Sequence, residues 1–311
     1  RASLIEEGAK LLRENPSDCV AENSFVVCKG KRISFGDIVA KGDLSRAYTD
    51  DQLAALPIKA RKDRKLVGVQ TAAIDIPAKV DGSTVYGIDA TYPGMVYAKP
   101  MMPPTRHGSV VKSVDDSAAK AVAGYQQTLV LDDPSDTVPG WALVIADSYH
   151  AALRAARVVK IDWQAGPGAD VSEADLLQRG AELLAGDTGS LVVDNEHVDH
   201  MFEAADSVLE ASYVTNTVLH FQLEPVNAIG LQRDGRWELH TGNQWQSLIL
   251  PTLGQALGVA PEKVVMRTYM LGGGFGRRLN GDYGVPALLA AKALGKPCLL
   301  YTSPSPRDPS I

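Results

Sequence analysis

Residues 264–278 read VVMRTYMLGGGFGRR, and a second apolar run follows at 285–294. The first run predicts a strand, the glycines at 272–274 predict a tight loop, and the second run predicts a helix. Strand, glycine loop and helix in this order form an anion-binding arrangement, because N–H groups without neighbouring Cβ atoms approach an oxyanion or a flat cofactor closely. Arg277 and Arg278 follow at once, and guanidinium groups suit phosphate oxygens. The spacing alone leaves a purely structural turn with solvated arginines as an equal alternative.

The residues around this loop, 207–298, predict a domain of strands and helices. Strands are expected at 208–214, 228–231 and 237–241, and the turn Asp234-Gly235 joins the last two. A helix is expected at 247–257, where Gly258 ends it.

Residues 66–165 predict another domain, in which strands alternate with short helices. The expected strands lie at 85–88, 95–99, 110–114, 128–131, 141–146 and 158–163, and the expected helices at 115–123 and 148–157. The last strand, helix and strand of this series read as a β-α-β unit. The predicted fold class is therefore a mixed α+β chain.

The remaining segments predict less regular structure. Residues 1–65 are expected to hold a helix at 2–13, one β-pair at 25–28 and 31–35, and helical turns at 37–40 and 50–56. Residues 166–206 predict a helical connection, with one helix from the N-cap Ser172 to Gly186 and another at 198–205. Because prolines cluster where a buried strand would follow, residues 299–311 are expected to be a non-native or artefactual tail, with a genuine linker as the alternative. The natural amino terminus is expected to precede Arg1.

Composition excludes several classes of protein. The chain has 311 residues, 45% of them hydrophobic, which suffices for one large or two to three ordinary domains, and its net charge of −6 argues against nucleic acid as a partner. Its cysteines, Cys19, Cys28 and Cys298, lack metal-ligand spacing, so we expect no iron–sulfur cluster or structural zinc here. Cys19 and Cys28 are expected to be small buried thiols, with a disulfide in an oxidising compartment as the alternative. No apolar run approaches about 20 residues, so no membrane span is expected.

Three segments of the domain at 207–298 together resemble the molybdopterin-binding large subunit of the xanthine oxidase and aldehyde oxidoreductase family of molybdenum hydroxylases. The segments are GGGFG at 272–276, TGNQ at 241–244 and HFQLEPVNA at 220–228. Residues 66–165 resemble the family's hammerhead domain, notably IPAKVDG at 76–82 and YPGMVYA at 92–98. The nearest branch is similar to isoquinoline 1-oxidoreductase β-subunits. The resemblance covers residues 66–297, and it implies that 207–298 form the first part of a molybdopterin-binding domain.

The resemblance implies a molybdenum ion held by a pterin dithiolene, with no side chain directly on the metal. Gln244 then lies beside the metal and donates a hydrogen bond to one of its oxo or sulfido ligands, whereas its structural alternative is a capped turn. The backbone of Phe275 and of its neighbours Gly273, Gly274 and Gly276 presents N–H groups to the cofactor. Gln244 and this loop are therefore expected to converge in space. The alternative for Phe275 is a core aromatic that anchors the loop.

The other polar and aromatic residues near these motifs also have expected roles. Arg277 and Arg278 are candidates for the pterin phosphate or for its dinucleotide extension, with a solvent or subunit-interface role as the alternative. His220 and Glu224 are expected to be structural polar groups. Trp245 is either a core residue or the wall of a pocket for a flat substrate.

The activity implied by the resemblance is hydroxylation of an aldehyde or of an N-heteroaromatic carbon, with water as the oxygen source. Leu279 stands where purine-oxidising relatives have a glutamate, so purines are not expected as substrates. The family's catalytic glutamate lies downstream of the residues present here. No general base is therefore predicted in this chain, and the chain alone is expected to be inactive.

Further partners follow from the same resemblance. Electrons are expected to pass to a small subunit with [2Fe-2S] clusters, and from there to an acceptor such as a cytochrome. The cofactor is molybdopterin, and a cytosine dinucleotide form is one option. The resemblance suggests the bacterial periplasm as location, with the cytoplasm as the alternative, and the sequence does not decide between them.

Two rival functions remain open at this point. A nicotinamide dehydrogenase would use the loop as a dinucleotide fingerprint, but Arg277 stands where that fingerprint needs glycine. A non-catalytic binding or assembly module would use the loop only as a turn. Metal analysis separates these functions from a molybdenum enzyme.

Overall fold

The computed structural model describes residues 1–186, 189–190, 192–193, 197–215, 220 and 222–301. The chain divides into two compact units, Arg1–Ile76 and Pro77–Ile311. Both combine helices and strands, so the predicted mixed fold class is confirmed. The predicted divisions near residues 165 and 206 remain predictions. Among the described residues, no helix has the length and apolar character needed to cross a membrane.

The first unit contains α-helices and a three-stranded antiparallel sheet. The strands are β1 (Cys19–Glu22), β2 (Phe25–Cys28) and β3 (Lys31–Ser34), and the helices are α1 (Ala2–Leu12), α2 (Phe35–Lys41) and α3 (Asp50–Ala55). The prediction of a single β-pair was wrong because β1 adds a third strand. The expectation of free thiols was also wrong, since Cys19 and Cys28 form a disulfide.

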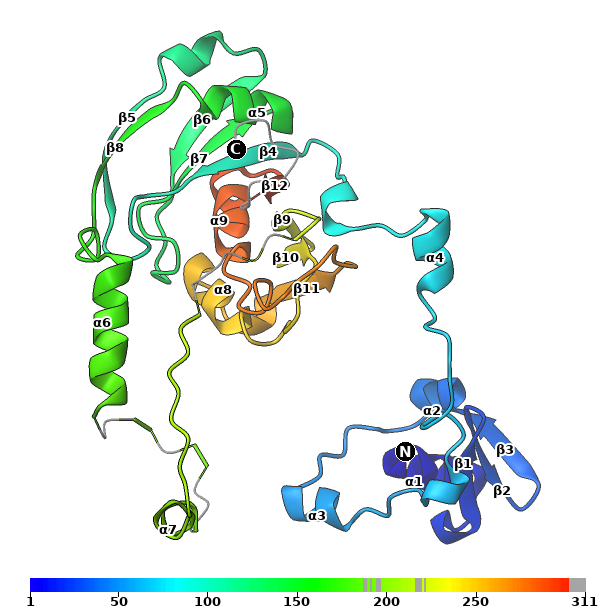
Figure 1. Ribbon diagram of the computed structural model, residues 1–311. Helices are drawn as coiled ribbons and strands as arrows, with labels where there is room; N and C mark the ends of the chain where they lie inside the picture. The colour runs from blue at the N-terminus through cyan, green and yellow to red at the C-terminus, as the bar shows by residue number, and fades with distance from the viewer. Residues whose placement is uncertain (187–188, 191, 194–196, 216–219, 221, 302–311) are drawn as a thin grey trace. The chain divides into compact units, whose positions relative to one another are not determined.

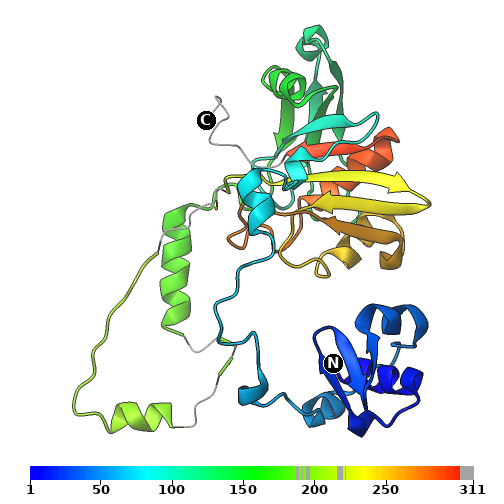
Figure 2. The ribbon, with the colours of Figure 1, turned by 90° about the vertical axis from the view of Figure 1, so that its right-hand side faces the viewer.

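The second unit is built on a seven-stranded sheet with the order β11-β10-β9-β12-β4-β7-β6. Its strands are β4 (Val96–Met101), β6 (Tyr125–Val130), β7 (Ala142–Ala146), β9 (Asn227–Arg233), β10 (Arg236–Thr241), β11 (Val264–Thr268) and β12 (Cys298–Tyr301). The pairs β10–β11 and β12–β4 are parallel, and the other pairs are antiparallel. In Figure 2, β9 and β10 (yellow) lie between β11 (orange) and β12 (red).

Helices cover both faces of this sheet. On one face α8 (Leu250–Leu257) and α9 (Gly284–Leu294) pack against the main apolar core (Figure 1). Every residue of α9 from Gly284 to Ala291 is buried, as expected of a helix that is apolar on all sides. On the other face α5 (Tyr149–Ala156) packs Ala151 and Ala152 against Ala146 of β7. The fully buried strand predicted at 141–146 is thereby confirmed.

Several predicted elements differ from the structure. Residues 85–88 form no strand: Tyr86 makes one isolated bridge with Met270, and the 3₁₀ turn η3 (Gly87–Asp89) follows. The described residues from 208 to 214 form no strand either. Strand β8 (Lys160–Gln164) pairs with β5 (Val110–Asp115) in a separate two-stranded sheet. The series β7, α5, β8 is therefore not a β-α-β unit of one sheet.

The connecting helices largely follow the sequence signals. Helix α6 (Glu173–Leu184) starts at Ser172, whose side chain forms a capping box with Asp175. It is followed by α7 (Val198–Glu203), and α4 (Ile76–Asp81) precedes the sheet. Residues 299–301, assigned in sequence to an artefactual tail, continue β12 between β9 and β4. Residues 302–311 lie outside the described residues.

Candidate cofactor site

The glycine loop follows the edge strand β11 and has an unusual backbone. Gly273, Phe275 and Gly276 have φ angles of 107°, 48° and 85°. A bulky aromatic residue in the left-handed region is strained, so surrounding contacts must hold Phe275 there. Residues 277–283 separate the loop from α9, which begins at Gly284. The helix expected at 285–294 is thereby confirmed.

Gln244 lies directly against this loop, as the expected convergence requires. Its Oε1 accepts a hydrogen bond of 3.1 Å from Gly276 N, and its own backbone N donates to Arg278 O over 3.1 Å. A Cβ placed on Gly274 would come within 2.6 Å of Gln244 Cδ, so only glycine lets the amide lie this close. With Oε1 engaged, the Gln244 Nε2 group has no hydrogen-bond partner among the described residues.

The loop also carries unused backbone donors. Gly272 N donates to Glu224 Oε2, and Gly276 N donates to Gln244. Between them, the N–H groups of Gly273, Gly274 and Phe275 have no acceptor in the described part of the chain. We call the N–H groups of Gly273, Gly274 and Phe275, together with the neighbouring Gln244 amide, the cradle; uncharged donors of this kind suit an anionic, oxygen-rich group.

The aromatic side chains near the cradle are exposed. Phe275 is 68% exposed and Trp245 is 51% exposed, so neither is a core residue in this structure. Trp245 Nε1 donates to Ser247 Oγ over 3.1 Å. The core alternatives for these two side chains were therefore wrong.

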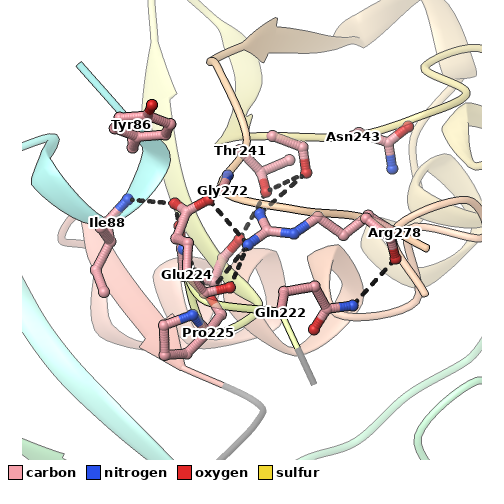
Figure 3. A network of polar contacts seen from close by, with 12 residues as sticks. Tyr86, Ile88, Gln222, Glu224, Pro225, Thr241, Asn243, Gly272 and Arg278 are labelled. Carbon is pink, nitrogen blue, oxygen red and sulfur yellow. Dashed lines mark hydrogen bonds and ion pairs between the residues drawn. The ribbon is translucent and has the colours of Figure 1, made fainter. Parts of the chain in front are cut away.

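Glu224 is the hub that fixes the loop to the sheet (Figure 3). Its Oε1 accepts from Ile88 N at 3.2 Å and from Asn227 Nδ2 at 2.9 Å. Its Oε2 accepts from Gly272 N at 2.8 Å and from Arg278 Nη2 at 2.9 Å. Since both oxygens are fully used, the expected structural role of Glu224 is confirmed.

The two adjacent arginines have different environments. Arg278 is completely buried, and its Nη2 also donates to the backbone oxygens of Glu224 and Pro225 (Figure 3). It is a structural cation, so its suggested phosphate role was wrong. The Arg277 side chain is 31% exposed and pairs with Asp282 over 2.7 Å. Arg106 contacts the same carboxylate over 3.2 Å, so two guanidinium groups share one acidic partner.

Some residues of the site were not predicted from the sequence. Gln222 is buried and donates from Nε2 to Gly274 O over 3.1 Å, while its Oε1 has no partner among the described residues. Tyr283 donates to Gly242 O over 2.9 Å and accepts from Asn243 Nδ2 over 3.0 Å. These two hydrogen bonds fix the 242–244 turn to Tyr283. Burial raises the pKa of Tyr283 and keeps its hydroxyl protonated as a donor. His220 is exposed.

A second polar cluster lies on β10 and its neighbours. His240 is buried, with Nε2 2.9 Å from Glu238 Oε2 and Nδ1 2.8 Å from Tyr92 Oη. Burial lowers the pKa of His240, and the hydrogen bond to Glu238 offsets part of that effect. Burial opposes ionisation of Glu238 as well, but hydrogen bonds from His240 and Arg267 leave its pKa below the ordinary value.

Comparison with known proteins identifies the domain that contains the glycine loop. Residues 186–304 match the family model described as the molybdopterin cofactor-binding domain. The chain is 50% identical over 308 residues to "Membrane-bound aldehyde dehydrogenase [pyrroloquinoline-quinone]" of Gluconacetobacter polyoxogenes, which covers 98% of this chain and 40% of that protein. It is 33% identical over 256 residues to "Isoquinoline 1-oxidoreductase subunit beta" of Brevundimonas diminuta, over 78% of this chain and 31% of that protein.

Solved structures show the same fold. Quinoline 2-oxidoreductase from Pseudomonas putida 86 superposes with a TM-score of 0.58 at 18% identity, over 77% of this chain and 35% of that chain. Aldehyde oxidoreductase from Desulfovibrio gigas superposes with a TM-score of 0.56 at 21% identity, over 74% of this chain and 29% of that chain. The chain thus spans two fifths or less of these longer proteins. Residues 186–304 thus match a molybdopterin cofactor-binding domain, and the relatives of the chain are members of the molybdenum hydroxylase family.

Proposed function

We propose that the protein is the large subunit of a molybdenum hydroxylase that oxidises an aldehyde or an N-heteroaromatic carbon, with water as the oxygen source. The observation that carries the proposal is the cradle within the matched domain. Three backbone N–H groups and the Nε2 group of Gln244, none with an acceptor among the described residues, lie close together in the chain's fold there, because Gln244 is hydrogen-bonded to the loop. This donor set fits the oxygen and sulfur atoms of a pterin-bound molybdenum, because neutral donors stabilise negative charge without competing as metal ligands.

The residues of this chain have distinct parts in the proposed site. Gly273, Gly274 and Phe275 offer N–H groups, and Gly276 holds the Gln244 amide so that its Nε2 group is free to donate. The half-buried Arg277 is the candidate for the phosphate of the pterin or of a cytosine dinucleotide extension. When bound, a molybdenum pterin supplies the two-electron redox chemistry and activates water. We assign no general base to the described residues.

The substrates and partners of the proposal rest on the relatives. One relative is named as an aldehyde dehydrogenase and the other as an isoquinoline oxidoreductase subunit, which supports these two substrate classes. A small subunit with [2Fe-2S] clusters and an acceptor such as a cytochrome complete the proposed electron path.

A second candidate cofactor comes from one of these names. The relative at 50% identity is named for pyrroloquinoline quinone. We favour molybdopterin because the domain match and the glycine cradle lie in the same stretch of the chain, at 186–304. A quinone cofactor would leave the free N–H groups of this loop without an assigned use.

Cofactor analysis of the full-length protein separates the candidates. The protein is purified from its own host together with its bound subunits, and its molybdenum, iron and extracted quinone are measured in one preparation. We expect about one molybdenum per large chain, because each large chain has one proposed cofactor site. Acid release of a cytidine nucleotide would identify the dinucleotide form. Quinone without molybdenum would refute the proposal, and a preparation with neither would favour a binding module.

A further inference from the structure

The hairpin of β1 and β2 places two cysteines directly opposite each other. Cys19 pairs with Cys28 in the strand register, and their Cα atoms are 4.4 Å apart. This spacing is typical of a non-hydrogen-bonded antiparallel pair, in which facing side chains approach most closely. The two thiols are therefore neighbours because of the strand pairing itself.

The turn between the strands fixes this register. Asn23 and Ser24 have φ angles of 49° and 64°, so both central residues of the two-residue turn are left-handed. Such a turn matches the twist of a hairpin and pairs Glu22 with Phe25. A shift by one residue would turn Cys19 and Cys28 to opposite faces of the strands.

The unit that contains this pair has a small buried core. Its buried centre consists of Ala9, Val26, Ile38 and the two cysteines, of which Cys19 is 7% exposed and Cys28 is 0% exposed, and the hydrophobic side chains packed around it are only partly buried. Small units with few buried apolar groups commonly need a covalent or metal staple. A disulfide across the hairpin ties β1, which begins the sheet, to the central strand β2.

We propose that the N-terminal unit matures in an oxidising compartment, where Cys19 and Cys28 are joined as a structural disulfide. The oxidant is a protein or small-molecule disulfide. One cysteine thiolate attacks a sulfur of the oxidant and releases one thiol, and the second cysteine then displaces the other thiol from the mixed disulfide. The two cysteines lose two electrons and two protons, which reduce the oxidant to two thiols. A reducing cytosol would keep the pair open.

The third cysteine is an internal control for this proposal. Cys298 is fully buried in β12, in the other compact unit, and it is a free thiol. Burial raises its pKa to about 12, so it forms almost no reactive thiolate. An oxidising compartment is therefore expected to pair Cys19 with Cys28 and to leave Cys298 reduced.

Thiol trapping in intact cells tests the proposal without any variant. Host cells that make the full-length protein are quenched with acid, and the denatured protein is alkylated before and after reduction. Mass spectrometry is expected to find the 19–28 segment unalkylated and lighter by two hydrogens before reduction, with Cys298 alkylated in both samples. Two alkylated cysteines in the 19–28 segment before reduction would overturn the proposal.

A second measurement tests the structural role of the bond. The double substitution Cys19→Ser and Cys28→Ser is compared with Cys298→Ser in the full-length protein by limited proteolysis. Loss of the Cys19–Cys28 disulfide is expected to speed cleavage within residues 1–76 by about tenfold or more, because the unit opens more often. Equal cleavage rates in the two variants would overturn the structural role. Neither result affects the proposed cofactor, since the two sites lie in different units.

Discussion

Replacement of Glu224 by glutamine is expected to loosen the glycine loop. The carboxylate joins four donors: two backbone N–H groups, the Asn227 amide and the Arg278 guanidinium. Glutamine has the same shape, but its nitrogen cannot accept a hydrogen bond. One pair of donors therefore loses its acceptor, and the buried Arg278 loses its counter-charge.

The size of this effect follows from burial. The side chains of Arg278 and Glu224 are 0% and 6% exposed, so water does not replace the lost partner. Breaking such a buried pair costs about 3–5 kcal/mol. If the loop opens locally, its hydrogen-bonded amide protons, those of Gly272, Gly276 and Arg277, should exchange about a hundredfold faster or more.

Hydrogen–deuterium exchange of the full-length protein measures this directly. Peptides that cover residues 270–278 are compared between wild type, Glu224→Gln and the exposed control Glu262→Gln. The double change Glu224→Gln with Arg278→Met should recover part of the protection, because it leaves no unpaired buried charge. If Glu224→Gln exchanges as slowly as Glu262→Gln, then Glu224 is not what holds the loop, and the reasoning is refuted.

Three further predictions concern single residues. Gln244→Ala is expected to keep the fold, because the side chain is exposed, and to lower kcat by about tenfold or more through loss of a donor at the cofactor; unchanged kinetics would remove Gln244 from the site. Gly274→Ala should lower the molybdenum content, since its Cβ would meet Gln244 Cδ at 2.6 Å; full metal loading would contradict the tight cradle. His240 has a pKa below its ordinary value, so its neutral form stabilises the fold above about pH 6.5, and that stability is lost as the pH falls toward the folded-state pKa. Melting curves of His240→Gln should show a smaller loss of stability on acidification than wild type, and parallel curves would exclude this contribution.

Much of the fold could be predicted because its signals are local. Ser172 caps its helix as expected, and the turn Asp234-Gly235 joins β9 to β10. Strand β1 was missed because its four residues alternate weakly and its Asn-Ser turn is less specific than one with glycine. Strand β12 was misjudged because the prolines that follow it outweighed the apolar residues at 298–300.

The site was predictable in its main chain and less so in its side chains. The resemblance to a known family predicted correctly that Gln244 lies beside the glycine loop. The difference in burial between Arg277 and Arg278 could not be predicted. Adjacent identical residues differ only in the direction in which the folded loop turns their side chains. The hub role of Glu224 depends on Ile88 and Gly272, which are distant in the sequence, and only the tertiary structure brings them to its carboxylate.

A structure of the full-length protein with its cofactor bound tests the central claim most directly. Density for a pterin-bound metal is expected within hydrogen-bond distance of Gln244 Nε2 and of the N–H groups of Gly274 and Phe275. Cofactor density at another place, with these donors facing solvent or protein atoms, would contradict it.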